Sequence, residues 1–422
     1  MSNCNEIHSE TLFVNIAKLI NVRVHNELVR GENLKILPVI DDAYLLIEDG
    51  IIADYGAMFE LEIKIPKLPK NVIDVTGKFI LPCWCDSHTH IVFAGSREDE
   101  FVDKIKGLTY AEIAAKGGGI LNSAQKLNQT SEEELYTTAL ERIKEIARLG
   151  TGTVEIKSGY GLCVEGEIKM LRVIKRLKEN SDLFIKSTFL AAHTYPIEFK
   201  ENHKGYINCI INEMLPVIAK ENLADFIDVF CETGFFSPEE MEEICLAGAA
   251  VGLQPKLHVN QLNSIGGIEK GIKNNALSLD HLETLSREEI NLLGNFEGCS
   301  TLLPTAAFFL RMPMQPAQIL ISAGAAVTLA SDFNPGTSPS GNMNFVTALS
   351  CIQMKMLPEE VINAATINGA YAMGCEKETG SIMIGKRADI IVTKKIPSIA
   401  YLFYSFSNNN IDSVMIKGQW VK

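Results

Sequence analysis

Between residues 80 and 375, short runs of apolar and β-branched residues alternate with longer stretches whose apolar residues recur at helical spacing. Eight of the short runs are predicted to be strands: residues 79–85, 151–157, 183–191, 226–231, 255–259, 276–281, 298–303 and 325–331. Such alternation is typical of parallel strands joined by right-handed helical crossovers. Eight units favour a closed ring over an open sheet, so the chain is predicted to be an α/β protein with a (β/α)8 TIM barrel.

The segments between these strands carry helix signals. Helices are predicted at residues 132–150, 165–180, 238–252 and 316–325. Ser237 stands directly before Pro238 and is suited to cap a helix start, while Gly252 is suited to end one.

The two ends of the chain follow a different pattern. Residues 1–80 and 379–422 hold short extended runs separated by turn residues, whereas the barrel pattern covers residues 81–378. Two β-rich ends around a barrel can pair in one small module, which would bring the termini close together. We therefore expect a barrel domain at 81–378 and a smaller β domain that both ends build.

Composition narrows the class of partner and the compartment. The chain has 422 residues with a net charge of −13 and no basic run, so a nucleic acid is not an expected partner. It shows neither a secretory signal at its start nor an apolar stretch long enough to span a membrane, so no membrane association is expected. The ten cysteines are scattered without a CxxC pair, which indicates reduced thiols and a cytoplasmic protein.

Candidate chemistry begins with His88-Thr89-His90, directly after the first predicted strand. Residues two apart in an extended segment point the same way, so both imidazoles can approach one metal ion. Their place at the carboxyl end of a strand is where barrel enzymes keep their active sites. An HxH pair alone is common, and two polar loop histidines remain an alternative interpretation.

Other strand ends supply further candidates. His258 ends the fifth predicted strand, His281 the sixth and Asp332 the eighth, and His193 follows the third. Three imidazoles and one carboxylate suit one zinc or iron(II) ion. The predicted metal ligands are His88, His90, His258 and Asp332, with a water molecule completing the site. His281 is left for proton transfer or oxyanion stabilisation, although a fifth ligand or a structural contact is also possible for it.

A second metal ion is not expected. Two-metal barrels of this kind use a lysine at the end of the fourth strand, and here Phe230, Cys231 and Glu232 stand there. Lys157 lies on the second predicted strand and is not counted as a bridge. The glycines at 117–119 lack the lysine and hydroxyl of a phosphate loop and indicate a flexible or tightly turning segment beside the pocket.

Longer motifs add a family resemblance. The segments DSHTHIVFAGSREDEF, GLTYAEIAAKGGGI, TVEIKSGYGL, FLAAHTYP, DVFCETGFFS, STLLPTAAFFLR and SDFNPGTSP occur in this order and cover nearly the whole barrel. They resemble the imidazolonepropionase family of the amidohydrolase superfamily. The resemblance implies a composite β-sandwich made by both chain ends, a homodimer, and histidine degradation as the pathway. Water would open 4-imidazolone-5-propanoate at its ring amide and give N-formimidoyl-L-glutamate.

The resemblance also implies substrate contacts. Arg97 can hold the propionate of the small anionic substrate, and Tyr110, Tyr160 and His193 can donate hydrogen bonds to it or to the ring. Gln261 can bond the ring but cannot be a base, so proton transfer is assigned to Asp332 and His281. The residues Asn334, Gly336 and Thr337 match positions that touch the substrate or the product carboxylate.

Simpler interpretations stay open for single residues and for the whole chain. Arg97 could be an ordinary surface ion-pair residue, and Gly336 could belong to a tight turn. A deaminase acting on another heterocycle would share the metal ligands. A barrel without activity could serve as a binding protein, although every expected ligand position is filled here.

Overall fold

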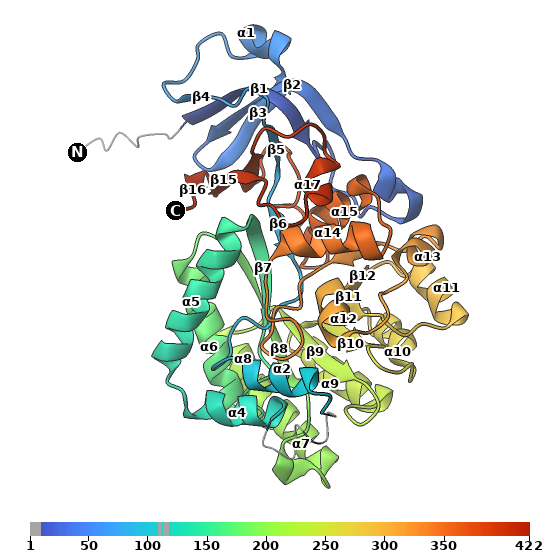
Figure 1. Cartoon of the computed structure of the whole chain (residues 1–422). Coiled ribbons are helices and arrows are strands. Elements are labelled where there is room, and N and C mark those ends of the chain that lie inside the picture. Colours follow the sequence, from blue (N-terminus) through green and yellow to red (C-terminus); the bar gives the residue numbers. More distant parts are fainter. Residues whose placement is uncertain (1–9, 109–111, 113–117) are drawn as a thin grey trace, which may run out of the picture.

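The computed structural model describes residues 10–108, 112 and 118–422. It consists of a small β-rich module at one end and a larger barrel of strands ringed by helices (Figure 1). The predicted α/β architecture, a barrel with a smaller module, is confirmed. The exact division of the chain at residues 81 and 378 stays a prediction.

Eight parallel strands form the barrel in the order of the chain. They are β6 (Trp84–Asp86), β7 (Thr151–Lys157), β8 (Phe184–Ala192), β9 (Phe226–Cys231), β10 (Gln254–Val259), β11 (Ser278–His281), β12 (Cys299–Leu302) and β13 (Val327–Leu329). Backbone hydrogen bonds beyond β6 and β13 link the two ends of this sheet: Asp332 N donates to His88 O at 3.0 Å, and His90 N to Phe333 O at 2.8 Å. The segments that follow the first and last strands are therefore fastened together at the carboxyl end of the barrel.

The first predicted strand is corrected by the structure. Residues 79–85 form two strands, β5 (Phe79–Pro82) in the small module and β6 in the barrel. The chain changes sheets at Cys83, because Cys83 N donates to Asp389 O at 2.9 Å and Trp84 N donates to Gly150 O at 2.9 Å. A continuous apolar run hides this change, since both sheets bury it. The other seven predicted strands agree with the structure to within two residues at each end.

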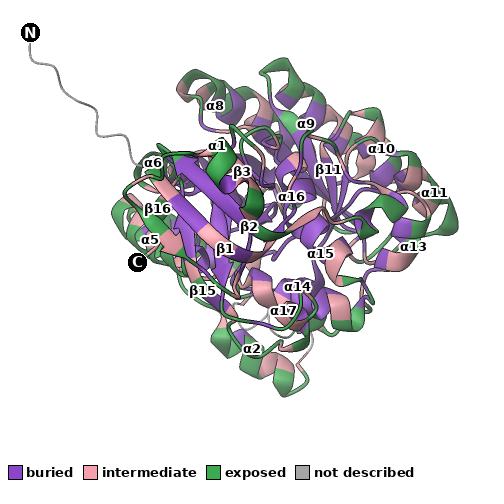
Figure 2. Ribbon diagram, turned by 90° about the horizontal axis from the view of Figure 1, so that it is seen from above, coloured by how far each residue is buried: buried purple, intermediate pink, exposed green. Residues whose placement is uncertain are grey.

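Helices cover the outside of the barrel and the connections around it. They are α2 (Glu98–Ile105), α4 (Ile120–Gln129), α5 (Glu132–Arg148), α6 (Val164–Asn180), α7 (His203–Cys209), α8 (Leu215–Glu221), α9 (Pro238–Ala250), α10 (Gly267–Lys273), α11 (Arg287–Asn295), α12 (Pro304–Leu310), α13 (Ala317–Ser322), α14 (Met343–Gln353), α15 (Pro358–Ala365), α16 (Ile367–Tyr371) and α17 (Tyr401–Tyr404). The four predicted helices correspond to α5, α6, α9 and α13, and Ser237 and Glu240 form a capping box at the start of α9. Their inner faces are buried and their outer faces exposed (Figure 2). Among the described residues, no helix has the length and apolar composition to cross a membrane.

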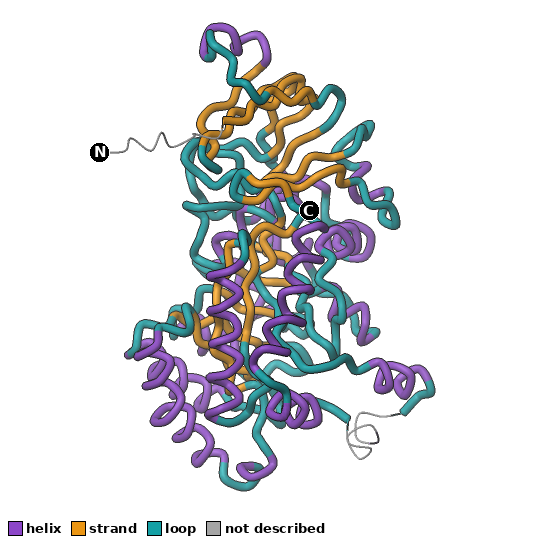
Figure 3. The backbone as a smooth tube through the Cα atoms, turned by 90° about the vertical axis from the view of Figure 1, so that its left-hand side faces the viewer, coloured by secondary structure: helices purple, strands orange, loops and turns teal. Residues whose placement is uncertain are grey.

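Both chain ends build the small module. Its strands are β1 (Glu10–Ile20), β2 (Val39–Glu48), β3 (Ile51–Ala57), β4 (Val72–Asp74), β5, β14 (Ile390–Thr393), β15 (Ile411–Ile416) and β16 (Gln419–Trp420), joined in one mixed sheet. β5 pairs with β1 on one side and β14 on the other, and a short helix, α1 (Leu61–Lys64), flanks the sheet. The rings of Phe13 and Trp420 meet edge to face, 5.9 Å between centroids. This module lies beyond one end of the barrel strands, the end at which β5 leads into β6 (Figure 3).

Buried amide side chains join the chain between β1 and β2 to the barrel. Asn368 on α16 accepts from Val29 N at 3.0 Å and donates to both Val29 O and Val327 O at 2.8 Å. Asn363 on α15 donates to Leu34 O at 2.9 Å. These bonds satisfy backbone groups that burial would otherwise leave unpaired.

Asn368→Leu should therefore destabilise the fold strongly. The substitution keeps a similar size but leaves one backbone N–H and two carbonyls buried without this partner, so the free energy of unfolding should fall by about 3 kcal/mol or more. Denaturant unfolding measures the change. Asn295→Leu, at an exposed amide on α11, is the matched control and should change stability by less than about 0.5 kcal/mol. Equal stability of the two variants would contradict this role.

Candidate active site

A cavity of about 580 Å³ opens at the carboxyl end of the barrel strands. Its walls include all but one of the described residues that the sequence predicts for the site. They are His90, Arg97, Tyr160, His193, His258, Gln261, His281, Asp332, Asn334, Gly336 and Thr337. His88 is completely buried beside this cavity, and Tyr110 lies outside the described residues. The structure thus brings together residues from six of the eight predicted strand ends and the loops after them.

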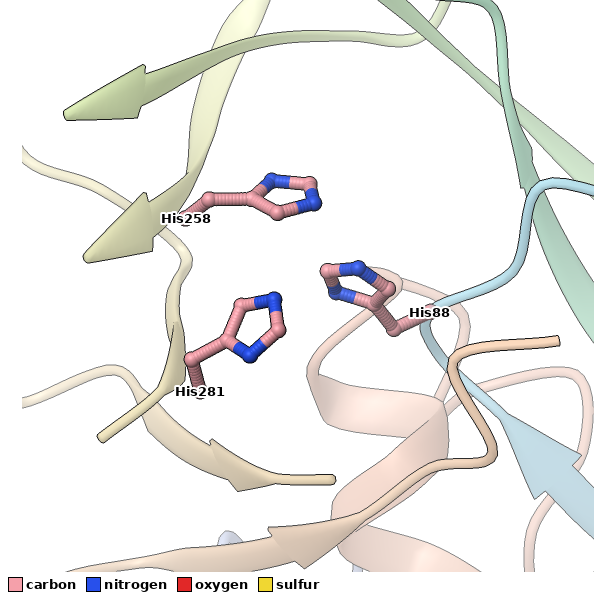
Figure 4. A group of neighbouring side chains, drawn as sticks. All are labelled: His88, His258 and His281. Carbon is pink, nitrogen blue, oxygen red and sulfur yellow. The ribbon is translucent and has the colours of Figure 1, made fainter. Parts of the chain in front are cut away.

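The histidines gather around His88. Its ring centroid lies 4.4 Å from that of His258, 5.4 Å from His90 and 5.6 Å from His281. Figure 4 shows the rings of His258 and His281 approaching that of His88 from neighbouring strands. Ligand atoms of these three lie within 4.8 Å of one another, and so do those of His88, His90 and Asp332. Five potential metal ligands therefore form two groups that share His88.

Two carboxylates fix which nitrogen each central ring presents. His88 Nδ1 donates to Asp280 Oδ2 at 2.7 Å, and His258 Nδ1 donates to Asp228 Oδ2 at 2.8 Å. The protons are thereby held on Nδ1, and the Nε2 lone pairs are left for a ligand.

The donor set fits a transition-metal cation. Within the described part of the chain, His88 Nε2 and His90 Nδ1 are buried without a hydrogen-bond partner. Burial also holds the pKa values of His88, His90 and His258 well below the ordinary value, so the rings are neutral. Neutral imidazoles with lone pairs facing one carboxylate suit a divalent ion such as zinc or iron(II).

A buried network of charges lies beneath the histidines. Lys157 Nζ donates to Glu155 at 2.8 Å and to Asp228 at 2.9 Å, and it lies 3.9 Å from Asp280. Burial opposes the ammonium form, but Asp228 and Glu155 hold the pKa of Lys157 above its usual value. Lys157 was not expected to act at the site. It lies against both carboxylates that orient the central histidines.

His281 has a carboxylate partner of its own. Its Nδ1 lies 3.3 Å from Glu283 Oε1, which also accepts from Gln315 Nε2 at 2.9 Å. Burial lowers the pKa of His281, but the neighbouring Glu283 outweighs it and raises that pKa above the ordinary value. His281 and Asp332 both have left-handed backbone, with φ of 88° and 51°. Such conformations are uncommon for residues other than glycine and often accompany a functional site.

The loop after β13 holds Asp332. Asp332 Oδ1 lies 3.5 Å from His90 Nε2, while Oδ2 accepts from Thr337 Oγ1 at 3.2 Å. Burial raises the pKa of Asp332 to about 6. Asn334 accepts from Gly336 N and Thr337 N, both at 2.8 Å, and donates to Asp332 O at 2.6 Å. The Asn334 side chain is therefore engaged in shaping this loop at both of its polar atoms.

Arg97 closes the far side of the cavity. It donates through Nε to Glu100 Oε1 at 2.9 Å and through Nη2 to Glu100 Oε2 at 2.5 Å. Its Nη1 lies against Gly336, where an added Cβ would come within 2.3 Å of that nitrogen. Arg97 is therefore ion-paired, but both side chains of the pair are largely buried rather than on the surface. One edge of the guanidinium is occupied by Glu100, and the Nη1 side remains for a ligand.

Tyr160 and His193 form the wall between these two ends. The loop that carries Tyr160 is held by Glu167, which accepts from Gly161 N at 2.7 Å and Gly159 N at 3.0 Å. His193 Nδ1 donates to Gly159 O at 3.1 Å, and burial lowers the pKa of His193 to about 4. The neutral ring then presents Nε2 as an acceptor, whereas a hydrogen-bond donor is predicted from the sequence.

Several residues that support the site were missed. They are Glu100, Lys157, Glu167, Asp228, Asp280 and Glu283. A usable signal exists for some of them. Glu155 and Lys157 are two apart in an apolar strand, and Asp228 stands within another, so charged side chains at inward-facing positions were visible. Glu100 gives no such signal, because it lies in a helix of ordinary polar composition.

Comparison with known proteins identifies the class. The sequence profile of the amidohydrolase family matches residues 79–421. Solved structures with the same fold include guanine deaminase from C. acetobutylicum, with a TM-score of 0.71 at 19% identity over 98% of this chain and 100% of that one. A triazine hydrolase variant aligns with a TM-score of 0.72 at 15% identity over 97% of this chain and 94% of that one.

Curated relatives narrow the class. A protein of Flavobacterium johnsoniae named imidazolonepropionase is 56% identical over 97% of this chain and 99% of its own length. One of Clostridium tetani with the same name is 40% identical over 93% of each chain. The chain therefore belongs to the amidohydrolase family, and within it to the group that carries the name imidazolonepropionase.

Asp228→Asn should weaken metal binding. An amide cannot hold the His258 proton on Nδ1 as a carboxylate does, so affinity for the cation should fall by about 10- to 100-fold. Metal content after dialysis against graded chelator, read by elemental mass spectrometry, measures this. Asp225→Asn is the control, because Asp225 accepts from Ser187 N at 2.9 Å near the start of β9, away from the histidines. If both variants retain metal equally, Asp228 has no such role.

Proposed function

We propose that the chain hydrolyses 4-imidazolone-5-propanoate to N-formimidoyl-L-glutamate, as expected of a hydrolase that acts on the carbon–nitrogen bond of a cyclic amide. The observation that carries the proposal is one cavity with two unlike ends. At one end stand neutral histidines and Asp332, and at the other stands Arg97. A cyclic amide with a carboxylate tail is complementary to such a cavity. The relatives' shared name supports this substrate.

The proposed cofactor is one divalent ion, zinc or iron(II). His88, His90, His258 and Asp332 are the proposed ligands, since their donor atoms lie in groups that share His88. His281 belongs to one of these groups too, but its carboxylate partner and raised pKa favour a role in proton transfer. When bound, the ion supplies Lewis acidity that lowers the pKa of a water molecule toward neutrality.

Asp332 and His281 are the proposed proton carriers. The carboxylate of Asp332, with a pKa near 6, accepts the proton that water loses as its oxygen adds to the ring carbonyl carbon. His281 carries a proton that stabilises the developing oxyanion. The carbon–nitrogen bond of the ring then breaks, and the leaving nitrogen takes a proton from one of these two groups. Water is consumed and no other reactant is needed.

The remaining wall residues are proposed to hold the substrate. Arg97 binds the propionate through its free Nη1 side, and Tyr160 donates from the wall beside it. His193 accepts a ring N–H through Nε2, and Gln261 hydrogen-bonds the ring from the same cavity. Asn334, Gly336 and Thr337 shape the loop that carries Asp332 and place backbone groups at the cavity. Tyr110 is included by resemblance.

A cytoplasmic location and a homodimer are part of the same proposal. The scattered cysteines support a reducing compartment, since those within the described residues are free. A net charge of −13 argues against nucleic acid as a partner. The family resemblance supports the homodimer, which light scattering of the purified protein would test.

The direct test is turnover of freshly prepared 4-imidazolone-5-propanoate. We expect its ultraviolet absorbance to fall with enzyme, treatment with a strong chelator to abolish the change, and added zinc or iron(II) to restore it. Chromatography should identify N-formimidoyl-L-glutamate. Release of ammonia from purines or pyrimidines, with no loss of the imidazolone, would instead indicate a heterocycle deaminase. Binding without turnover would indicate an inactive barrel.

His281→Ala should separate proton transfer from metal binding. Turnover should fall by about two to four powers of ten while metal content stays near that of the wild type. His25→Ala is the control and should retain full activity, because His25 is exposed and does not line the cavity. Loss of the metal from the His281 variant would make His281 a ligand instead.

A further inference from the structure

A second cation stands beside Arg97 at the far end of the cavity. Lys104, on α2 one turn after Glu100, lines the same cavity. Its Nζ donates to Gly336 O at 3.1 Å. Gly336 is also the residue against which Arg97 Nη1 packs. Both cations therefore contact one residue of the loop that follows Asp332.

The charge balance at this end depends on Lys104. Glu100 accepts from two nitrogens of Arg97 and from Gly119 N at 2.9 Å. Burial alone would raise the pKa of Glu100, but these bonds hold it below the usual value, so Glu100 is ionised. Arg97 and Glu100 thus form a pair of no net charge. Apart from the histidines, the described residues that line the cavity and carry formal charges are Arg97, Lys104 and Asp332, so the net positive charge at the Arg97 end comes from Lys104.

The nearby positive charge of Arg97 also disfavours the charged form of Lys104. It is half-buried, and burial followed by the charge of Arg97 lowers the pKa of Lys104. Two cations that share one loop residue and are partly shielded from water favour an anion between them. A single carboxylate would accept hydrogen bonds from both and relieve the repulsion.

We propose that Lys104 is a specificity-determining residue that selects substrates with an anionic side chain. Arg97, already paired with Glu100, orients the carboxylate through its directional Nη1 side. Lys104 supplies the unpaired positive charge. The inference rests on the proposed function, because it concerns the acid tail of that substrate. A neutral tail of the same length would gain little from Lys104.

The test compares an acid with its amide in two ways. The first is turnover of 4-imidazolone-5-propanoate and of the analogue whose tail ends in a carboxamide. The second is calorimetric binding of 3-(imidazol-4-yl)propanoate and its amide, which lack the reacting carbonyl. Lys104→Met should raise KM and Kd for the acids by about 10- to 100-fold, the loss expected for a charged hydrogen bond. Values for the amides should change by less than about threefold.

Control variants test whether the loss of any nearby positive charge, or misfolding, would produce the same effect. Lys106→Met removes the same charge from an exposed position two residues along the chain and should leave the acid and amide values unchanged. Lys104→Arg should restore most of the preference for the acid, because it restores the charge. The acid and the amide are compared within one variant. Partial misfolding would therefore reduce the active fraction of protein for both compounds alike and leave the ratio of their KM or Kd values unaltered.

Other outcomes would overturn the inference. Equal weakening of acid and amide in Lys104→Met would give Lys104 only a structural role at Gly336 O. An unchanged preference for the acid over the amide in Lys104→Met would mean that Arg97 alone recognises the carboxylate. A wild type that binds the acid no better than the amide would leave no preference to explain. Absence of imidazolone turnover by the wild type, with a normal acid preference in calorimetry, would contradict the proposed function and leave the anion specificity standing.

Discussion

The hydrogen bonds from His88 to Asp280 and from His258 to Asp228 are the contacts on which the site depends. Each bond fixes the proton on Nδ1 and thereby turns an Nε2 lone pair toward the other histidines. Five buried ionisable groups support them: the carboxylates of Glu155, Asp228 and Asp280, with Lys157 and Lys256 between them. When all five are ionised, negative charge exceeds positive by one in this layer. A cation above the layer offsets that excess, so the charge arrangement and the donor set favour the same ligand.

The fold places the histidines, which must be held rigidly, on different elements from the residues that are proposed to select the substrate. The histidines proposed to bind the metal stand on strand ends or directly after them, while the residues at the far end of the cavity come from α2 and the loop after β13. β6, which leads into His88 and His90, continues from β5 after one residue, Cys83. The small sheet therefore anchors the start of the segment that carries these two histidines, and the backbone bonds to the Asp332 segment fasten its end. Rigid anchoring at both ends suits a site that binds a metal.

The sequence predicted the barrel and the clustering of the histidines with Asp332, because both leave local signals. Strand and helix periods alternate, and histidines recur at strand ends such as His90 and His258. The division of residues 79–85 between two sheets left no signal, since apolar residues fill both strands. The supporting charges were only partly visible. Lys157 was recognised as unsuited to bridge two metals, but its contact with Asp228 depends on strands 71 residues apart. Lys104 resembles an ordinary helix residue, and its proximity to Gly336, 232 residues away, exists only in the folded chain.

Anomalous X-ray diffraction from crystals of the purified protein is the most direct test of the central claim, that one cation lies among these histidines. Data collected on both sides of the zinc and iron absorption edges would locate and identify the ion. We expect a single peak about 2.0–2.2 Å from nitrogens of His88, His90 and His258 and from an oxygen of Asp332. A fully occupied metal elsewhere in the chain, or well-ordered histidines with no peak among them after metal reconstitution, would contradict the account.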